Sequence, residues 1–195
     1  GKIILLCDKM SESKPLGNVF LTNTLKKKNK FNLSSIPITT IVDNDLVPFI
    51  KGLKTNKDII DSNHFKNIFG YDKKYFETHP LALCKKTKSI LDQYFNYISQ
   101  IFKYDWEKDA NTFLISSKYF SAFIRLLRYY LFDKNILLID IKNELEDLKK
   151  KIDNITKPNN SESLPKGNLD VPSTKHGIKT IFEFLKDVNT FKPKK

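Results

Sequence analysis

The amino-acid sequence predicts a mainly α-helical protein, with a small N-terminal β portion followed by a helical bundle and a C-terminal helical extension. Apolar residues recur at intervals of three and four in several segments after residue 44, whereas short runs rich in Ile, Val, Phe and Thr occur before it. The chain of 195 residues is 40% hydrophobic and 12% aromatic, which is enough apolar surface to build a core.

Residues 1–43 are predicted to form the β-rich end of a truncated N-terminal domain. Strand-like runs cover residues 3–7, 18–22 and 36–42, and Ser, Pro, Gly and Asn residues separate them. Gly1 is followed at once by the first of these runs. We therefore expect that sequence upstream of it is missing.

Residues 44–155 are predicted to form a helical domain that opens with two short helices. Asp and Asn residues around position 44 offer N-caps for a helix that ends near residue 53. Asn56 can cap a second helix, which Gly70 ends because glycine readily adopts the left-handed conformation found after helices.

The two central segments of this domain carry the clearest helical periodicity. The first covers residues 87–104, and the second begins after Ser116 and Ser117. We expect these two helices to form the core. Their apolar positions are Ile90, Leu91, Tyr94, Phe95, Ile98, Ile101 and Phe102 in the first helix, and Phe120, Phe123, Ile124, Leu127, Tyr130 and Leu131 in the second.

Residues 135–155 carry a narrower apolar stripe, typical of a heptad seam with charged residues around it. The seam can pair with a second copy of the chain or with a protein partner, which would make it an oligomerisation surface. Alternatively, it packs on the helices of its own domain. The seam consists of Leu138, Ile141, Leu145, Leu148, Ile152 and Ile155.

The end of the sequence divides into a linker and a final helix. Residues 156–173 are rich in Pro, Asn, Ser and Gly, a composition typical of a linker. Residues 174–195 are predicted to form an amphipathic helix followed by a Lys-rich tail. The apolar positions of this helix are Ile178, Ile181, Phe182, Leu185 and Val188.

The formal net charge of +12 favours a phosphate polyanion or an anionic membrane surface as a partner. The coding bias of an AT-rich genome is a second explanation for this charge, because such a genome favours Lys together with Asn, Ile, Phe and Tyr, which are all abundant here. Three basic groups are candidate contacts to nucleic acid. They are Lys26, Lys27, Lys28 and Lys30 in one loop; Lys85, Lys86 and Lys88; and Arg125 and Arg128 with Lys118.

Arg125 and Arg128 are the only arginines in the sequence. A guanidinium group forms paired hydrogen bonds to phosphate or carboxylate that lysine cannot form, so arginine at these positions suggests a geometric demand. The two residues are three apart and share a helix face with Lys118. The alternative is ion pairing with a neighbouring helix, and the lysine groups can equally be solvated surface. The candidate carboxylates for such ion pairs are Asp92, Asp105 and Glu107.

The sequence contains no strong catalytic or metal-binding constellation. Ser11 and Lys14 match a Ser-x-x-Lys pair, and Glu12 with Lys14 matches half of a nuclease site, but this segment reads as a loop without a well-placed second carboxylate. We predict no catalytic residue, no metal and no cofactor, with a divergent metal-dependent nuclease as the weakest alternative. Three residues lack the close ligand spacing of a structural zinc site, namely His64, His79 and Cys84.

Cysteine usage and hydropathy predict a cytoplasmic protein that does not bind membranes. Cys7 and Cys84 are far apart and neither belongs to a CxxC pair, which favours a reducing compartment. No apolar run approaches the ~20 residues of a membrane helix. Residues 2–7 are too short for the hydrophobic region of a signal peptide.

The helix at residues 91–102, the Tyr104-Asp105-Trp106 after it and the segment at residues 112–127 carry a family resemblance. Over residues 36–135 the chain resembles the C-terminal half of DGQHR-domain proteins, a bacterial group that includes the DndB-like proteins associated with DNA phosphorothioation. Residues 173–185 are similar to the short helical ending of some members. The Asp-Gly-Gln-His-Arg signature itself is absent, so no functional residue of that motif is carried over.

The resemblance implies a DNA-linked role in DNA modification, its regulation or phage defence. Together with the basic groups, it leads to the prediction of a non-enzymatic helical module that contacts DNA phosphates. The alternative function is a protein–protein interaction or oligomerisation module that uses the seam at residues 138–155.

Overall fold

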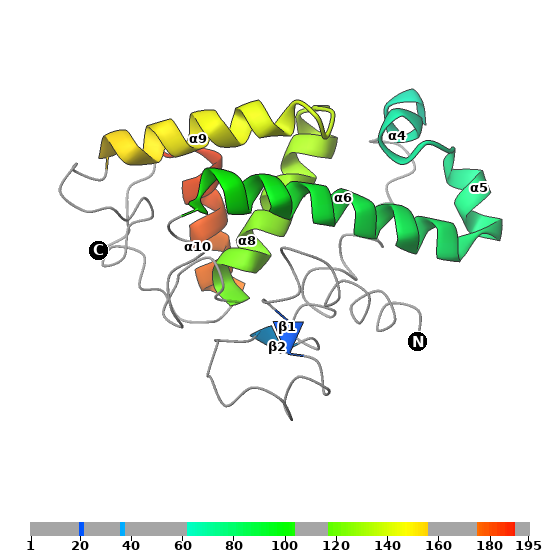
Figure 1. Cartoon of the computed structure of the whole chain (residues 1–195), viewed down its shortest axis with the longest axis horizontal. Coiled ribbons are helices and arrows are strands. Elements are labelled where there is room, and N and C mark those ends of the chain that lie inside the picture. The colour runs from blue at the N-terminus through cyan, green and yellow to red at the C-terminus, as the bar shows by residue number, and fades with distance from the viewer. Residues whose placement is uncertain (1–19, 22–35, 38–61, 104–116, 156–174, 190–195) are drawn as a thin grey trace.

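The computed structural model describes residues 20–21, 36–37, 62–103, 117–155 and 175–189, and this part of the chain is mainly α-helical (Figure 1). The predicted fold class is therefore confirmed. The helices are α4 (Ser62–Phe69), α5 (Lys73–Thr78), α6 (Pro80–Ile101), α8 (Ser117–Arg128), α9 (Ile141–Ile155) and α10 (Lys175–Lys186), with a π-helical turn, η5 (Tyr129–Asp133), directly after α8.

Two short strands lie within the runs that predicted β structure. Strand β1 (Phe20–Leu21) pairs in parallel with β2 (Ile36–Pro37), and Phe20 lies opposite Ile36. The rest of the predicted β portion, the expected helix near residue 50, the linker and the basic tail lie outside the described residues.

Helix α4 ends at Phe69, as the position of Gly70 predicts. Gly70 has a φ of +81°, and its N–H donates to the carbonyl of Lys66 at 2.7 Å. The last carbonyl groups of a helix have no hydrogen-bond donor within the helix, and this hydrogen bond satisfies one of them. The chain then turns into α5, whose first turn is capped by Asp72.

Replacing Gly70 with Ala is expected to lower the free energy of unfolding by about 1–2 kcal/mol. The loss comes from the left-handed backbone alone, because a Cβ at this position meets nothing within 4 Å. Gly70→Asn is the matched control and should lose less, since asparagine tolerates this conformation better. Chemical denaturation of the three proteins measures the difference, and wild-type stability in Gly70→Ala would contradict the prediction.

Helix α6 begins at Pro80, two turns earlier than the expected start at residue 87. Proline is favoured in the first turn of a helix because its missing N–H would have no partner there. Leu83 and Thr87 are buried and extend the apolar face of the later turns. The expected start was wrong because Lys85 and Lys86, between these two positions, obscure the apolar pattern.

The core lies where α6 and α8 pack against each other. The rings of Phe95 and Phe120 stack at 4.6 Å, and Phe102 and Phe123 meet edge to face at 5.8 Å. The Tyr94 hydroxyl donates to the carbonyl of Phe123 at 3.0 Å. The expectation that these two amphipathic helices form the core is confirmed, because all four phenylalanines are buried.

Helix α10 packs along α8 and shares its core (Figure 1). Of the apolar positions expected in this helix, Phe182 is half-buried and the others are buried, and Phe184 joins them. Almost every side chain of α8 is consequently enclosed. In the described residues, no helix is long and apolar enough to cross a membrane.

Helix α9 runs beside α6 and begins at Ile141, six residues after the start of the segment predicted at residues 135–155 (Figure 1). Ile141, Leu145, Leu148 and Ile152 are all buried in the core of the single chain. Leu138 is half-buried against the same core. The four buried positions therefore pack within their own chain, as the alternative interpretation of the seam expects. The oligomerisation surface stays a prediction, and the side chain of Ile155 lies outside the described residues.

Candidate nucleic-acid interface

Helix α8 passes without a break into the π-helical turn η5. Such turns are rare and occur frequently at functional sites. The N–H of Lys134 donates to the carbonyl of Tyr129 at 2.9 Å, and Ile136 donates to Tyr130 at the same distance. Asn135 has a φ of +54° and turns the chain toward α9. The turn leaves Tyr129 half-buried, whereas Tyr130 points into the core.

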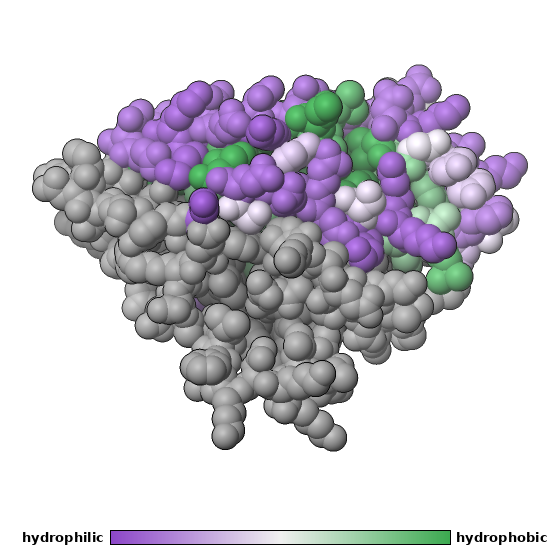
Figure 2. Space-filling model, viewed as in Figure 1, coloured by the Kyte–Doolittle hydropathy of each residue, from purple (hydrophilic) through white to green (hydrophobic). Residues whose placement is uncertain are grey.

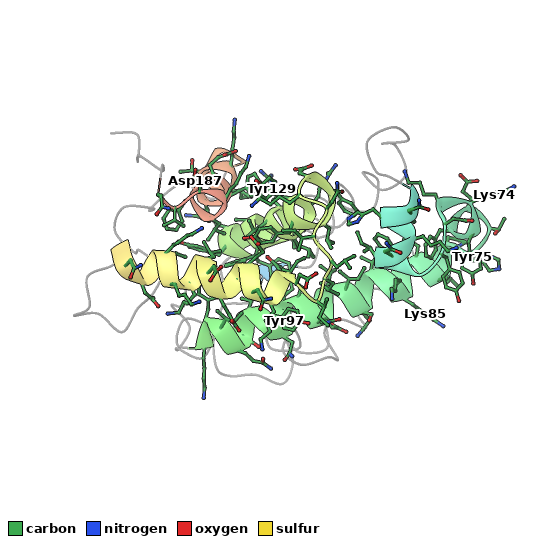
Figure 3. All side chains as sticks on the ribbon, turned by 90° about the horizontal axis from the view of Figure 1, so that it is seen from above. Lys74, Tyr75, Lys85, Tyr97, Tyr129 and Asp187 are labelled. Atoms are coloured by element: carbon green, nitrogen blue, oxygen red, sulfur yellow. The ribbon has the colours of Figure 1, made fainter. Side chains whose placement is uncertain are left out.

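The ring of Tyr129 has lysine side chains from two segments near it. The Lys186 ammonium lies 4.8 Å from the ring centroid and the Lys134 ammonium 5.8 Å from it. Phe182 of α10 contacts the ring edge to face at 6.3 Å. Figure 3 shows Tyr129 next to α10, the helix that carries Lys186. Cation–π attraction therefore holds two positive charges close to one aromatic ring.

Arg125 lies one turn before Tyr129 on α8 and Arg128 directly before it. Both arginines are half-buried, as is Lys118 two turns before Arg125, whereas every residue of α8 between Lys118 and Arg125 is buried. The three basic residues therefore occupy the strip of α8 that its neighbours leave uncovered. This arrangement agrees with the face that their spacing predicts.

Of the three carboxylates proposed as ion-pair partners of the arginines, the structure describes only Asp92. Asp92 lies 2.5 Å from the ammonium of Lys88, on its own helix. Asp105 and Glu107 lie outside the described residues. Among the residues that are described, no ion pair involves Arg125 or Arg128.

Together, Arg125, Arg128, Tyr129, Lys134 and Lys186 form what we call the α8 basic surface. Its charges come from α8, from the residue after η5 and from α10; of these, α10 is far from the other two in the sequence and meets them only in the fold. Sequence reasoning missed Tyr129 and both lysines, because a contact between two helices leaves no spacing signal.

Acidic groups near the α8 basic surface moderate its charge. Lys134 lies 4.0 Å from a carboxylate oxygen of Glu144, and both side chains are more than two-fifths exposed. An exposed pair of this kind contributes little and is screened by salt. Asp187 follows Lys186 on the same segment, and Figure 3 shows it beside α10. The surface is cationic overall but not uniformly so.

The other predicted basic groups do not join the α8 basic surface. Figure 3 shows Lys85 near α5, at the end of the molecule away from Tyr129. Lys85 is exposed and Lys86 half-buried, whereas Lys88 is paired with Asp92. The loop that contains Lys26, Lys27, Lys28 and Lys30 lies outside the described residues.

The titratable groups in and next to the core have structural roles. Burial raises the pKa of Tyr94 and of Tyr130 above the ordinary value, with a smaller contribution from Glu144 for Tyr130. Both hydroxyls therefore stay protonated. The Nε2 of His64 donates to the Leu131 carbonyl at 2.6 Å and ties α4 to η5. Within the described ranges no group of His, Cys, Asp and Glu residues could hold a metal ion.

Comparison of the chain with protein-family models, with curated proteins and with solved structures gave no match. The resemblance to DGQHR-domain proteins therefore stays a prediction.

Proposed function

We propose that this chain is a non-enzymatic helical module of a cytoplasmic, DNA-associated protein and that the α8 basic surface contacts DNA phosphates. The observation that carries the proposal is the approach of Lys134 and Lys186 to the ring of Tyr129, which directly follows the helix that carries the half-buried Arg125 and Arg128. The role in DNA modification, its regulation or phage defence that the sequence resemblance implies is part of the same proposal.

The side-chain chemistry suits phosphate oxygens. Each guanidinium can form two parallel hydrogen bonds to a phosphate, and the two lysines add point charges beside it. The net charge of +12 attracts a polyanion over a longer range. Phosphate contacts position a protein on DNA but carry no sequence information, so this surface would bind duplexes with little sequence preference.

Replacing Arg125 and Arg128 with Ala is expected to weaken duplex binding by at least roughly 10-fold, because charge-assisted hydrogen bonds are lost. The slope of log affinity against log salt concentration should become shallower by about 2, one unit for each phosphate contact. Fluorescence anisotropy with a labelled duplex over a salt series measures both quantities.

Two control variants make this experiment specific. The double Lys variant, R125K/R128K, keeps the charges but loses the paired geometry, so it should keep the salt slope and lose part of the affinity. K149A/K150A removes two charges from α9, where these lysines pair with Asp153 and Asp147. An equal loss in K149A/K150A would contradict the assignment, and unfolding of the Arg-to-Ala variant would instead indicate that the arginines hold the domain together.

The alternative function, an interaction module that docks through the α9 seam, stays a proposal, but four of the six seam residues are buried within the single chain. A smaller apolar site lies before α9, where Ile139 is 70% exposed and Leu137 38% exposed. Figure 2 shows a mostly hydrophilic surface over α9, interrupted by hydrophobic residues near its first turn. Two exposed residues are too small a patch to carry a stable protein interface.

A further inference from the structure

The rings of Tyr71, Tyr75 and His79 form a stack, which we call the aromatic ladder. The centroids of Tyr71 and Tyr75 are 4.1 Å apart with an interplanar angle of 16°. Those of Tyr75 and His79 are 4.2 Å apart with an angle of 6°. The three residues recur every four positions, the spacing that aligns side chains along one helix face.

Local contacts hold the ladder in place. The carboxylate of Asp72 accepts the N–H of Tyr75 at 2.8 Å and starts α5 directly after Tyr71. The imidazole Nδ1 of His79 lies 3.1 Å from the Tyr75 carbonyl and 2.9 Å from the Thr78 hydroxyl. The hydrogen bonds fix both the backbone and the terminal ring, so the stack is preorganised.

A buried phenylalanine anchors the ladder to the fold. Phe76 is buried and contacts Tyr71 and Tyr75 edge to face at 6.1 and 5.5 Å. On its other side it meets Phe65 and Phe69 of α4, each at 6.1 Å. The ladder is therefore the outer layer of an aromatic cluster whose inner residues, Phe65, Phe69 and Phe76, are buried.

The two ends of the ladder are exposed. Tyr71 is 52% exposed and His79 also belongs to the exposed residues, whereas Tyr75 is half-buried between them. Apart from the ladder itself, neither terminal ring is stacked on another ring of the described residues. Each terminal ring consequently has exposed aromatic surface to which a further planar group has access.

Lysine side chains are frequent on α5 and on the first turns of α6, at the end of the molecule that carries the aromatic ladder. Lys74 of α5 and Lys85 of α6 are exposed, and Figure 3 shows both near Tyr75. Residues 72–86 contain four lysines against two acidic residues, which are Asp72, the cap of α5, and the exposed Glu77. The charge favours an anionic partner, and the open rings favour one with planar aromatic groups.

We propose that the aromatic ladder is a binding site for single-stranded nucleic acid. Unpaired bases would stack on the open faces of Tyr71 and His79, while Lys74 and Lys85 would contact the backbone phosphates. Aromatic rings with adjacent cations are the usual means of binding single strands without sequence preference. A duplex cannot use the site, because its bases already stack on one another. The site is thus separate from the phosphate contacts proposed for α8 and does not depend on them.

The test uses the whole chain and a fluorescein-labelled oligo(dT) of about 12 nucleotides, within the range of known single-strand sites. Replacing Tyr71 and His79 together with Ala removes both terminal rings, and neither of the two replaced residues is buried. We expect roughly 10-fold weaker binding of the oligonucleotide, and unchanged binding of a duplex. Tyr71→Phe keeps the ring and should bind like the wild type.

A second probe separates stacking from charge. An abasic oligonucleotide of equal length carries the same phosphates but no bases, so it should bind the wild type less tightly than oligo(dT). The double Ala variant should bind the two probes equally. Wild-type affinity for oligo(dT) in that variant, equal binding of both probes by the wild type, or an equal loss of duplex binding would each overturn the proposal. Arg125→Ala with Arg128→Ala should weaken duplex binding and retain the preference for bases, so the two proposals can fail independently.

Discussion

Replacing Phe123 with Ala is expected to lower the free energy of unfolding by about 3–5 kcal/mol, the range typical of truncating a buried phenylalanine. Phe123 is fully buried at the crossing of α6 and α8, and its ring meets Phe102. Alanine would remove most of this buried surface and leave a cavity, because the surrounding rings can close only part of the space.

Denaturant unfolding followed by circular dichroism measures this loss. Native domains are stable by only about 5–15 kcal/mol, so the variant should be partly unfolded well below the wild-type midpoint. The matched control is Ile139→Ala, which shortens a side chain that is 70% exposed and should change stability by less than about 0.5 kcal/mol. Similar stability of the two variants would show that α6 and α8 do not pack as described.

The core could be predicted from the sequence because local periodicity and burial agree there. Ile90, Leu91, Tyr94 and Phe95 recur at helical spacing, and all four are buried. Gly70 likewise marks the end of α4, since the left-handed conformation that ends many helices strongly favours glycine. These features depend on a few neighbouring residues, so the sequence alone contains the signal.

The candidate site depends on contacts between distant segments and was predicted only in part. The pairing of Arg125 and Arg128 on one face follows from their spacing, but the approach of Lys186 to Tyr129 follows from the packing of α10 on α8. The aromatic ladder has a local spacing signal in Tyr71, Tyr75 and His79. Sequence reasoning missed it because α5 has only six residues, too few to show a helical periodicity of its own.

The heptad seam shows a different limit of prediction from sequence. An apolar stripe on a helix requires a partner surface, but the stripe does not reveal whether that surface belongs to the same chain. In this structure α6 supplies the partner surface for α9. A helix that packs within its own chain and a helix that pairs with a second chain can have the same apolar pattern. Stability measurements distinguish the two, because only the second depends on protein concentration.

Leu145→Ala is therefore expected to lower the free energy of unfolding by about 2–5 kcal/mol in a manner independent of protein concentration. Leu145 is fully buried within the single chain, so its truncation weakens the fold of each molecule rather than an association between molecules. If the seam instead joined two copies, stability would depend on concentration by mass action, and the variant would shift the sedimentation of the protein toward a smaller species.

Thermal unfolding and sedimentation at several protein concentrations distinguish these cases. Lys151→Ala, at an exposed position of the same helix, is the control and should leave both measurements unchanged. A lower unfolding temperature for Leu145→Ala at every concentration, with the same sedimenting mass as the wild type, is the expected result. If the wild type is a dimer and Leu145→Ala dissociates it, the seam lies in the interface between two copies, and the oligomerisation interpretation is supported.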